Sequence, residues 1–428
     1  MLSYDIETVT PEEIKQIVNR GEAALESSLE RARPIVETVR KDGDAAVIRY
    51  AKEFDGFGGG SFTVPPSTIR SAPSRIPSAL LSAIKDSRRR IEAYHIKQKL
   101  KGFEFKDSCG VFGQKVVPLE RVGIYAPGGT ASYASSVLMT AVPARVAGVE
   151  EIVLCTPSKN GVVDDVVLAA ASIVGIEEVY AIGGAQAIGA MAYGTETVRR
   201  VAKMVGPGGA IVTAAKLLVR KDCEIDFLAG PSEVLIITDS STDPALVAVE
   251  MLAQLEHDPN AIALAISTSN KVIGESMNLL GGMIQKAERK DVIEVAAKKG
   301  AIFIKVRNLR QALQISNDFA PEHLVIDTRD PEALLDEVRA AGSVFLGKWS
   351  SVAFGDYCAG TNHVLPTMGM ARSRSALSVY DFVRTIPYQE LTRKGAERLA
   401  PVAAKMAEAE GLPAHASAAN ARTGGDDR

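Results

Sequence analysis

Short apolar runs that end in glycine-rich turns place the strongest restriction on how this chain can fold. The runs cover residues 122–125, 151–155, 179–182 and 203–205, and three of them are followed within a few residues by paired glycines. Stretches with helical spacing separate the runs. Strands that alternate with helices are typical of a parallel sheet whose strands are joined by crossover helices. We therefore expect an αβα domain in the middle of the chain.

The same alternation continues beyond residue 233. Further strands are expected at residues 234–238, 262–266, 302–304, 324–326 and 343–346. We predict an α/β fold with two Rossmann-like αβα domains built on parallel-type sheets, plus small helical N-terminal and C-terminal domains. The boundaries assign 23–124 with 233–376 to the first domain, 125–232 to the second, 1–22 to an N-terminal helical segment and 377–428 to a helical tail. The N-terminal helix is expected to start near Thr10-Pro11-Glu12, and the helix of the tail near Pro387.

Composition excludes several classes of protein. The 428 residues carry a formal net charge of -3, which argues against nucleic acid or an anionic membrane as the main partner. The N-terminus lacks a basic segment followed by an apolar run, and the longest apolar run is too short to cross a bilayer. The four cysteines are scattered and form no CxxC pair. We expect a soluble, cytoplasmic protein without disulfides.

Four segments carry ionisable groups outside any core pattern. Taken singly, each has a plain interpretation as a solvated helix face, a strand cap or an exposed tail. Together they contain four of the five histidines, and only the fifth, His95, fits an apolar helix face. Histidine, aspartate and amide oxygen donors favour a zinc site, although manganese or cobalt could substitute. The candidate residues are Gln254 and His257, Glu322 and His323, Asp356 and His363, and Glu410 and His415.

The glycine turns suggest a nucleotide, but weakly. None of them matches GxGxxG or GxxxxGK[ST], and any αβ turn requires glycine. Several such turns on one sheet would still present helix N-termini, which suit a pyrophosphate.

The chain resembles the histidinol dehydrogenase family in many ordered blocks along almost its whole length. The matching blocks include Tyr125-Ala126-Pro127-Gly128-Gly129-Thr130, Gly183-Gly184-Ala185-Gln186, Ala229-Gly230-Pro231-Ser232-Glu233-Val234, Gln254 to His257, Ala320 to Leu324, Gly355 to Thr367, Ser378 to Phe382, and Glu410 to His415. The resemblance implies oxidation of L-histidinol to L-histidine in two NAD⁺-dependent steps through an aldehyde. It also implies one zinc ion per subunit and a homodimer with intertwined tails, in which Glu410 and His415 complete the partner's site.

The resemblance also implies a role for each site residue. His323 would be the base during hydride transfer, and Glu322 would activate the water that hydrates the aldehyde. The implied zinc ligands are Gln254, His257, Asp356 and His415. The implied substrate contacts are Ser232, Gln254, His257, His323, Asp356, Glu410 and His415. Tyr125, Gln186 and the position of Gly209 would contact NAD⁺, and His363 would shape its loop.

One departure from the family pattern concerns NAD⁺. The family usually has asparagine where this chain has Gly209, and an aromatic residue where it has Ile211. Loss of one side-chain hydrogen bond costs on the order of 1 kcal/mol, which is several-fold in cofactor affinity. Two alternatives therefore stay open: a related dehydrogenase of another polar alcohol, such as a sulfonated diol, and a zinc-binding homologue with impaired NAD⁺ binding.

Overall fold

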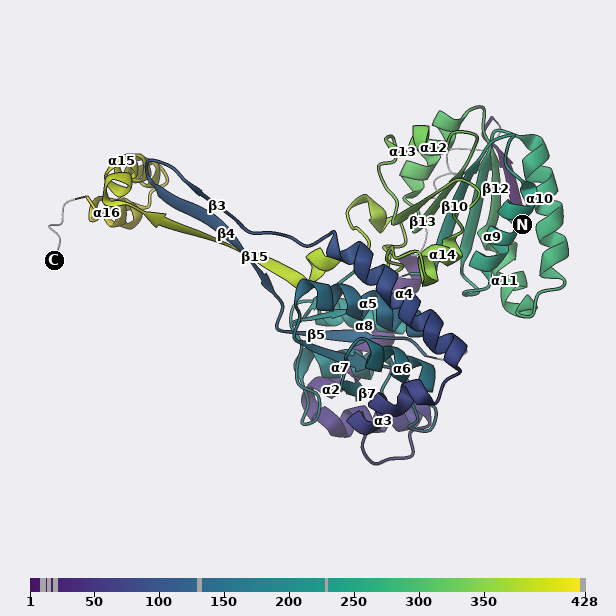
Figure 1. Cartoon of the computed structure of the whole chain (residues 1–428), viewed down its shortest axis with the longest axis horizontal. Helices are drawn as coiled ribbons and strands as arrows, with labels where there is room; N and C mark the ends of the chain where they lie inside the picture. The colour runs from purple at the N-terminus through teal and green to yellow at the C-terminus, as the bar shows by residue number, and fades with distance from the viewer. Residues whose placement is uncertain (8–12, 14–16, 18–21, 129–132, 228–229, 424–428) are drawn as a thin grey trace.

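The chain forms two α/β lobes and a narrow arm that reaches away from both (Figure 1). The computed structural model describes residues 1–7, 13, 17, 22–128, 133–227 and 230–423. Parts of the predicted N-terminal helix, including Thr10-Pro11-Glu12, lie outside the described residues, as do Gly129, Thr130, Ala229 and the last five residues. Among the described helices, none is long and apolar enough to cross a membrane.

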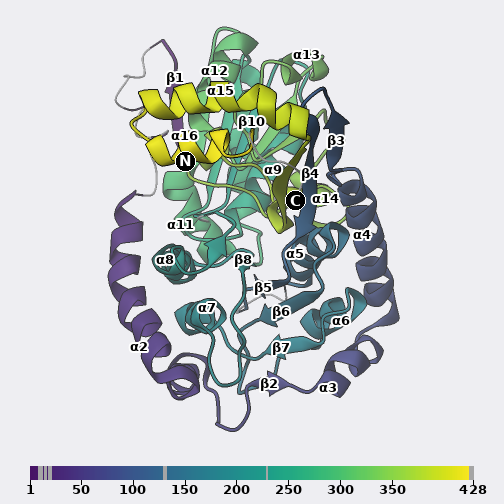
Figure 2. The same cartoon turned by 90° about the vertical axis from the view of Figure 1, so that its left-hand side faces the viewer.

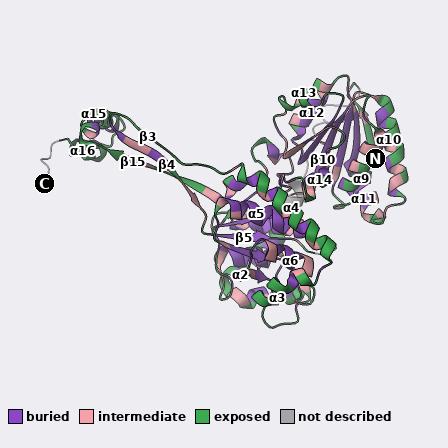
Figure 3. Ribbon diagram, viewed as in Figure 1, coloured by how far each residue is buried: buried purple, intermediate pink, exposed green. Residues whose placement is uncertain are grey.

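Sheet A has the strand order β1-β12-β11-β10-β13-β14, and all its strands are parallel. Separate apolar clusters cover its two faces, and Figure 3 shows its strands buried beneath partly exposed helices. Its strands are β1 (Leu2–Asp5), β10 (Glu233–Thr238), β11 (Ile262–Ser267), β12 (Ala301–Lys305), β13 (His323–Asp327) and β14 (Ser343–Leu346). Its helices are α9 (Pro244–Leu255), α10 (Asn270–Ile284), α11 (Lys290–Gly300), α12 (Leu309–Phe319), α13 (Glu332–Leu335) and α14 (Val352–Tyr357).

Sheet B has the order β2-β7-β6-β5-β8-β9, and only β2 runs antiparallel to its neighbour. The four strands β7-β6-β5-β8 follow the 3-2-1-4 order of dinucleotide-binding folds, so the chain reverses direction between β5 and β8. Its strands are β2 (Thr63–Val64), β5 (Arg121–Tyr125), β6 (Glu151–Cys155), β7 (Glu178–Tyr180), β8 (Lys203–Val205) and β9 (Glu224–Ile225). Its later helices are α5 (Ala134–Ala147), α6 (Asp165–Ile173), α7 (Gly184–Tyr193) and α8 (Ala210–Val219).

The prediction for residues 1–124 was wrong in two places. Residues Leu2–Asp5, expected in a helix, form the edge strand β1 of sheet A. The helices α2 (Glu22–Asp55), α3 (Pro66–Ser71) and α4 (Ser78–Ile96), expected in the domain of 233–376, pack on sheet B instead. Their apolar faces join the clusters around β5, β6 and β7, so burial and not chain order decides where they belong.

The arm contains an antiparallel sheet that the sequence analysis did not predict. It has the order β15-β4-β3, and two helices pack on each other at its end (Figure 2). Its elements are β3 (Phe103–Lys106), β4 (Gly110–Pro118), β15 (Val383–Leu391), α15 (Arg393–Ala409) and α16 (Pro413–Asn420). The expectation that the tail is helical from Pro387 was wrong, because Pro387 lies in β15 opposite Gln114.

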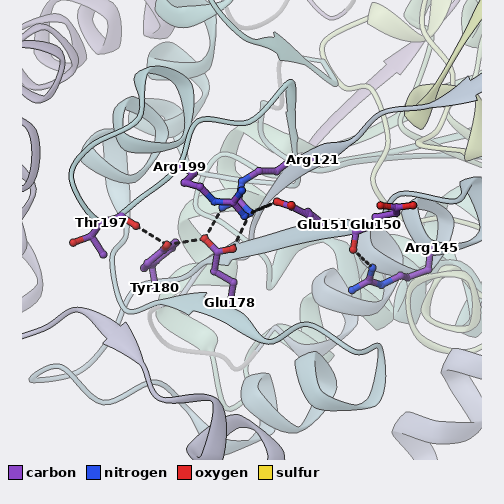
Figure 4. A network of polar contacts seen from close by, with 8 residues as sticks. All are labelled: Arg121, Arg145, Glu150, Glu151, Glu178, Tyr180, Thr197 and Arg199. Carbon is purple, nitrogen blue, oxygen red and sulfur yellow. Dashed lines mark hydrogen bonds and ion pairs between the residues drawn. The ribbon is translucent and has the colours of Figure 1, made fainter.

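A polar network ties together the amino ends of the central strands of sheet B (Figure 4). The Arg121 guanidinium donates to Glu151 at 2.9 Å and to Glu178 at 2.8 and 2.5 Å. Arg199 donates to the same Glu151 carboxylate at 2.6 Å. Arg121, Glu151 and Glu178 are the first residues of β5, β6 and β7, at the edge of sheet B opposite to the glycine turns. We therefore interpret the network as structural.

Candidate active site

The Glu322-His323 pair lies at the amino end of β13, next to the amino end of β10. Helix α12 ends at Phe319, and the left-handed φ of 51° at the next residue, Ala320, turns the chain toward the strand. The register pairs His323 with Val234, so Glu322 is beside Glu233. Both members of the pair are buried. A carboxylate and an imidazole are thus held in the interior where two central strands begin.

The backbone of Glu233 fixes the tautomer of His323. Nδ1 of His323 lies 2.9 Å from the Glu233 carbonyl oxygen. Because a carbonyl can only accept, Nδ1 carries the proton, and the lone pair of the neutral ring is on Nε2. Nε2 is buried without a hydrogen-bond partner among the described residues and lies 3.6 Å from Oδ1 of Asp356. The free nitrogen of this histidine therefore faces the Asp356 loop.

The backbone N–H of the same residue, Glu233, orients Glu322. The Glu233 N–H donates to Oε2 of Glu322 at 2.8 Å. Burial raises the pKa of Glu322 to about 8. Burial opposes protonation of His323, but the Glu322 and Asp356 carboxylates raise the pKa of that imidazole. Carboxylic acids whose pKa lies near neutrality are suited to move protons at physiological pH. Sequence analysis missed the role of Glu233, because it depends on strand register.

Helix α9 delivers Gln254 and His257 to the same edge of sheet A. Asp243 caps the helix by accepting from the Ala245 N–H at 2.9 Å, and the helix ends at Leu255. Gln254 is buried, and its Nε2 has no hydrogen-bond partner among the described residues. His257 follows the helix and is exposed at the rim. Partial desolvation nevertheless lowers the pKa of His257, although the Asp356 charge opposes this.

Asp356 lies in the last turn of α14, which is tied to α9 by Glu250. Oε2 of Glu250 accepts from the Val352 N–H at 3.3 Å. Glu250 is one helical turn before Gln254, so both side chains lie on one face of α9. Burial favours the neutral form of Asp356, but His323 outweighs this effect and, with two other histidines, holds the pKa of that carboxyl below its ordinary value.

These side chains fit part of a metal site. Gln254 offers an amide oxygen, His257 an imidazole whose pKa is lowered and Asp356 a carboxylate whose pKa is lowered, and these donor types suit Zn²⁺. The α9 C-terminus adds a partial negative charge, which favours a cation. Within the described part of the chain, however, no group of three or more His, Cys, Asp or Glu side chains could hold a metal. The set lacks a fourth protein donor.

His363 braces the Asp356 loop. Its Nδ1 donates to the Asp356 carbonyl oxygen at 2.8 Å, and burial lowers the pKa of its ring. This contact with the backbone fits the supporting role expected for His363.

Glu410 and His415 lie far from the other site residues of the same chain. Both are exposed, at the end of α15 and the start of α16, at the tip of the arm (Figure 1). The structure therefore does not bring them to the Asp356 loop of their own chain.

Tyr125 and Gln186 meet at the carboxyl edge of sheet B. The Tyr125 hydroxyl accepts from the Gly184 N–H at 3.1 Å, and burial raises the pKa of Tyr125 to about 12. Gln186 is buried at the start of α7, and its Oε1 has no partner among the described residues. Ser232, the remaining expected contact, precedes β10 and is partly exposed. The unsatisfied amide oxygen of Gln186 leaves an acceptor available to a ligand.

A buried ion pair shapes the turn after β8. Nζ of Lys216 lies 2.8 Å from Oδ1 of Asp226 and 2.5 Å from the Gly206 carbonyl oxygen. Oδ2 of Asp226 accepts from the Gly206 N–H at 2.8 Å. A Cβ at Gly206 would meet the Tyr125 carbonyl oxygen at 2.1 Å, so only glycine fits. The turn is thus fixed at the point where the strand order reverses.

Gly209 begins α8 with open space around it. Its φ of -65° and ψ of 175° are accessible to any residue, and a Cβ there would meet nothing within 4 Å. Glycine is therefore not required here by the backbone or by packing.

We expect Gly209→Asn to strengthen cofactor binding. An asparagine at this helix start would offer a side-chain hydrogen bond to a nucleotide and could also cap α8. The Kd for NADH should fall several-fold, equivalent to roughly 1 kcal/mol. Fluorescence titration would measure it, with Gly209→Ala as the control that fills the same space without a polar group. Equal Kd values for the two variants would contradict this prediction.

Comparisons with known proteins agree on one family. The family model described as "Histidinol dehydrogenase" matches residues 18–423. A histidinol dehydrogenase of Methanocaldococcus jannaschii is 43% identical over 425 residues, covering 99% of both chains. One from Archaeoglobus fulgidus is 44% identical and covers 94% of this chain and 97% of its own.

A solved structure shares the fold along the whole chain. The crystal structure of histidinol dehydrogenase from Elizabethkingia anophelis superposes with a TM-score of 0.93 at 34% identity, covering 99% of this chain and 98% of its own. The chain therefore belongs to the histidinol dehydrogenase family, whose members are oxidoreductases of histidine biosynthesis that use NAD⁺ and zinc.

Proposed function

We propose that this protein oxidises L-histidinol to L-histidine through L-histidinaldehyde, in two NAD⁺-linked steps at a zinc-containing site. The observation that carries the proposal is the backbone of Glu233, whose carbonyl accepts from His323 and whose N–H donates to Glu322. The two backbone groups of one residue thus orient two proton-transfer groups of different chemistry. A four-electron oxidation needs a base for the alcohol and a second base for the water that hydrates the aldehyde.

In the first oxidation His323 acts as the base. Its Nε2 takes the hydroxyl proton of L-histidinol as the carbinol C–H bond breaks and the aldehyde forms. NAD⁺, when bound, accepts the hydride of each oxidation. The carbonyl of Glu233 keeps the lone pair on Nε2 throughout. Asp356 raises the pKa of His323, so a cation held by that carboxylate would weaken this effect and leave Nε2 able to accept a proton.

In the second step Glu322 takes a proton from water as the water oxygen adds to the aldehyde carbon. His323 releases its first proton to solvent before the second oxidation, so that its Nε2 can take the remaining hydroxyl proton of the anionic hydrate as the carboxylate of L-histidine forms. The buried position of Glu322 raises its pKa to about 8, which gives a base strong enough for this proton transfer.

Gln254, His257 and Asp356 would hold zinc, which supplies a positive centre for the imidazole and amine of the substrate. We place Ser232 among the substrate contacts, together with His323 and the three zinc-binding residues. Tyr125, Gln186 and the turn at Gly209 would contact NAD⁺. Among the described residues, the unpaired Oε1 of buried Gln186 supports the assignment to NAD⁺.

We further propose a homodimer in which the arm of one subunit completes the partner's site. His415 would then be the fourth zinc ligand, and Glu410 would contact substrate. Two features support this arrangement: the incomplete donor set on one chain and the exposure of both residues at the tip of the arm. The arm also exposes large apolar side chains, which a partner could cover: Phe103, Phe105, Val402, Met406 and Leu412. A cytoplasmic location belongs to the same proposal and is supported by four unpaired cysteines.

The decisive assay follows NADH formation from L-histidinol with and without a zinc chelator. We expect NADH in the untreated protein and its loss on chelation, with recovery when zinc is added. Oxidation of another polar alcohol, such as a sulfonated diol, without oxidation of L-histidinol would contradict the substrate. Zinc binding with no oxidation of any alcohol would favour a homologue with impaired NAD⁺ binding.

A further inference from the structure

The last residue of α2, Asp55, brings a carboxylate to the carboxyl edge of sheet B. Its Oδ2 accepts from Nε2 of Gln186 at 3.4 Å, and the Gly183 N–H is near enough to lower its pKa. Its charge also contributes to the raised pKa of Tyr125. Asp55 is thus grouped with both side chains that we assign to the dinucleotide, although the sequence analysis did not select it.

This carboxylate keeps acceptor capacity for a ligand. Asp55 is only partly buried, and burial raises its pKa while the Gly183 N–H opposes that rise. A carboxylate has about four acceptor positions, and the two contacts above leave some of them free.

The position of Asp55 matches a requirement of the fold. Where strands follow the 3-2-1-4 order, an acidic residue after the second strand commonly accepts hydrogen bonds from the adenosine ribose. The second strand here is β6, and the residues after it, Thr156-Pro157-Ser158, include no carboxylate. A Cβ at Gly183 would come 2.4 Å from Cγ of Pro157. The turn after β6 therefore packs against Gly183, the residue whose N–H lies near Asp55. Helix α2 therefore brings a carboxylate beside the β6 turn.

The contacts of Asp55 also restrict where phosphates can bind. At the start of α7 the Gly184 N–H donates to the Tyr125 hydroxyl, and the Gly183 N–H lies close to the Asp55 carboxylate. A negative charge at this helix start repels a pyrophosphate. Hydroxyl groups, which can donate to a carboxylate, are the chemistry that fits here.

We propose that Asp55 binds the adenosine ribose hydroxyls and selects NAD⁺ over NADP⁺, an inference that rests on the proposed NAD⁺-linked function. The carboxylate accepts hydrogen bonds from the 2′- and 3′-hydroxyls. A 2′-phosphate in the same place removes one donor and brings negative charge against Asp55.

The test is fluorescence titration of the full-length protein with NADH and NADPH. We expect the wild type to bind NADPH at least about tenfold more weakly than NADH. Asp55→Asn keeps an oxygen acceptor for the Gly183 N–H but removes the charge. We expect this variant to bind NADH several-fold more weakly than the wild type does. The ratio of the Kd for NADPH to the Kd for NADH should fall by about tenfold. Glu53→Gln, an exposed carboxylate on the same helix, should change neither Kd.

An unchanged Kd ratio in Asp55→Asn would overturn the inference, as would equal binding of the two nucleotides by the wild type. If the wild type still produces NADH from L-histidinol in that case, the proposed function stands and only the role of Asp55 fails. Absence of binding to either nucleotide by the wild type would overturn both.

Discussion

Replacement of His323 by alanine should lower kcat for NAD⁺-dependent oxidation of L-histidinol by about 10²- to 10⁴-fold, the range found when a general base is removed. The zinc content should remain that of the wild type, because His323 is not among the proposed ligands. Steady-state kinetics and metal analysis on the same preparation measure both quantities. Loss of zinc together with activity would mean that His323 holds the metal, and our assignment would be wrong.

Glu322→Gln provides the matched variant. Glutamine keeps the shape and an oxygen acceptor for the Glu233 N–H, which lies 2.8 Å from the native carboxylate, but it cannot accept a proton from water. The first oxidation should therefore persist while the second slows. L-Histidinaldehyde should accumulate, and the NADH yield per histidinol should fall. If the rates of the two oxidations fell equally, the Glu322 carboxylate would not act specifically in hydration of the aldehyde.

The central strands of both sheets could be predicted because burial on two faces leaves a continuous apolar signal, whereas the edge strands β1, β2 and β9 were missed. The expected strands 151–155, 203–205 and 343–346 coincide with β6, β8 and β14. The arm gave no such signal. All four residues of β3 are exposed, as are most of β15, so their sequences lack a buried face and only long-range pairing identifies them as strands.

The site residues that carry their own chemistry could be found from sequence, but those that orient them could not. Asp356 and His323 stand out as ionisable groups in a loop and before a strand. Glu233 acts through its backbone N–H and carbonyl and not through its side chain. Its importance therefore depends on the register between β10 and β13. Glu250 matters because it joins α9 to α14, a contact across 102 residues. Neither role leaves a local pattern in the chain.

Replacement of His415 by alanine should remove most zinc and most activity, because it takes away one of the two imidazoles among the four proposed zinc ligands. Purified His415→Ala should therefore bind zinc at least about tenfold more weakly than wild type. Zinc titration with a competing chelator measures this. Wild-type zinc affinity in this variant would contradict His415 as a ligand.

A mixed dimer distinguishes a ligand from the same chain from one supplied by the partner. His323→Ala damages the lobe, and His415→Ala damages the arm. If the arm completes the partner's site, a heterodimer of these two inactive chains has one site with both lesions and one site with neither. Random pairing makes half of the dimers mixed, so co-expression should restore about one quarter of wild-type activity. If each arm instead served its own lobe, every site would carry one lesion and the mixture would stay inactive. The exposed position of His415 at the end of the arm makes recovery the expected result.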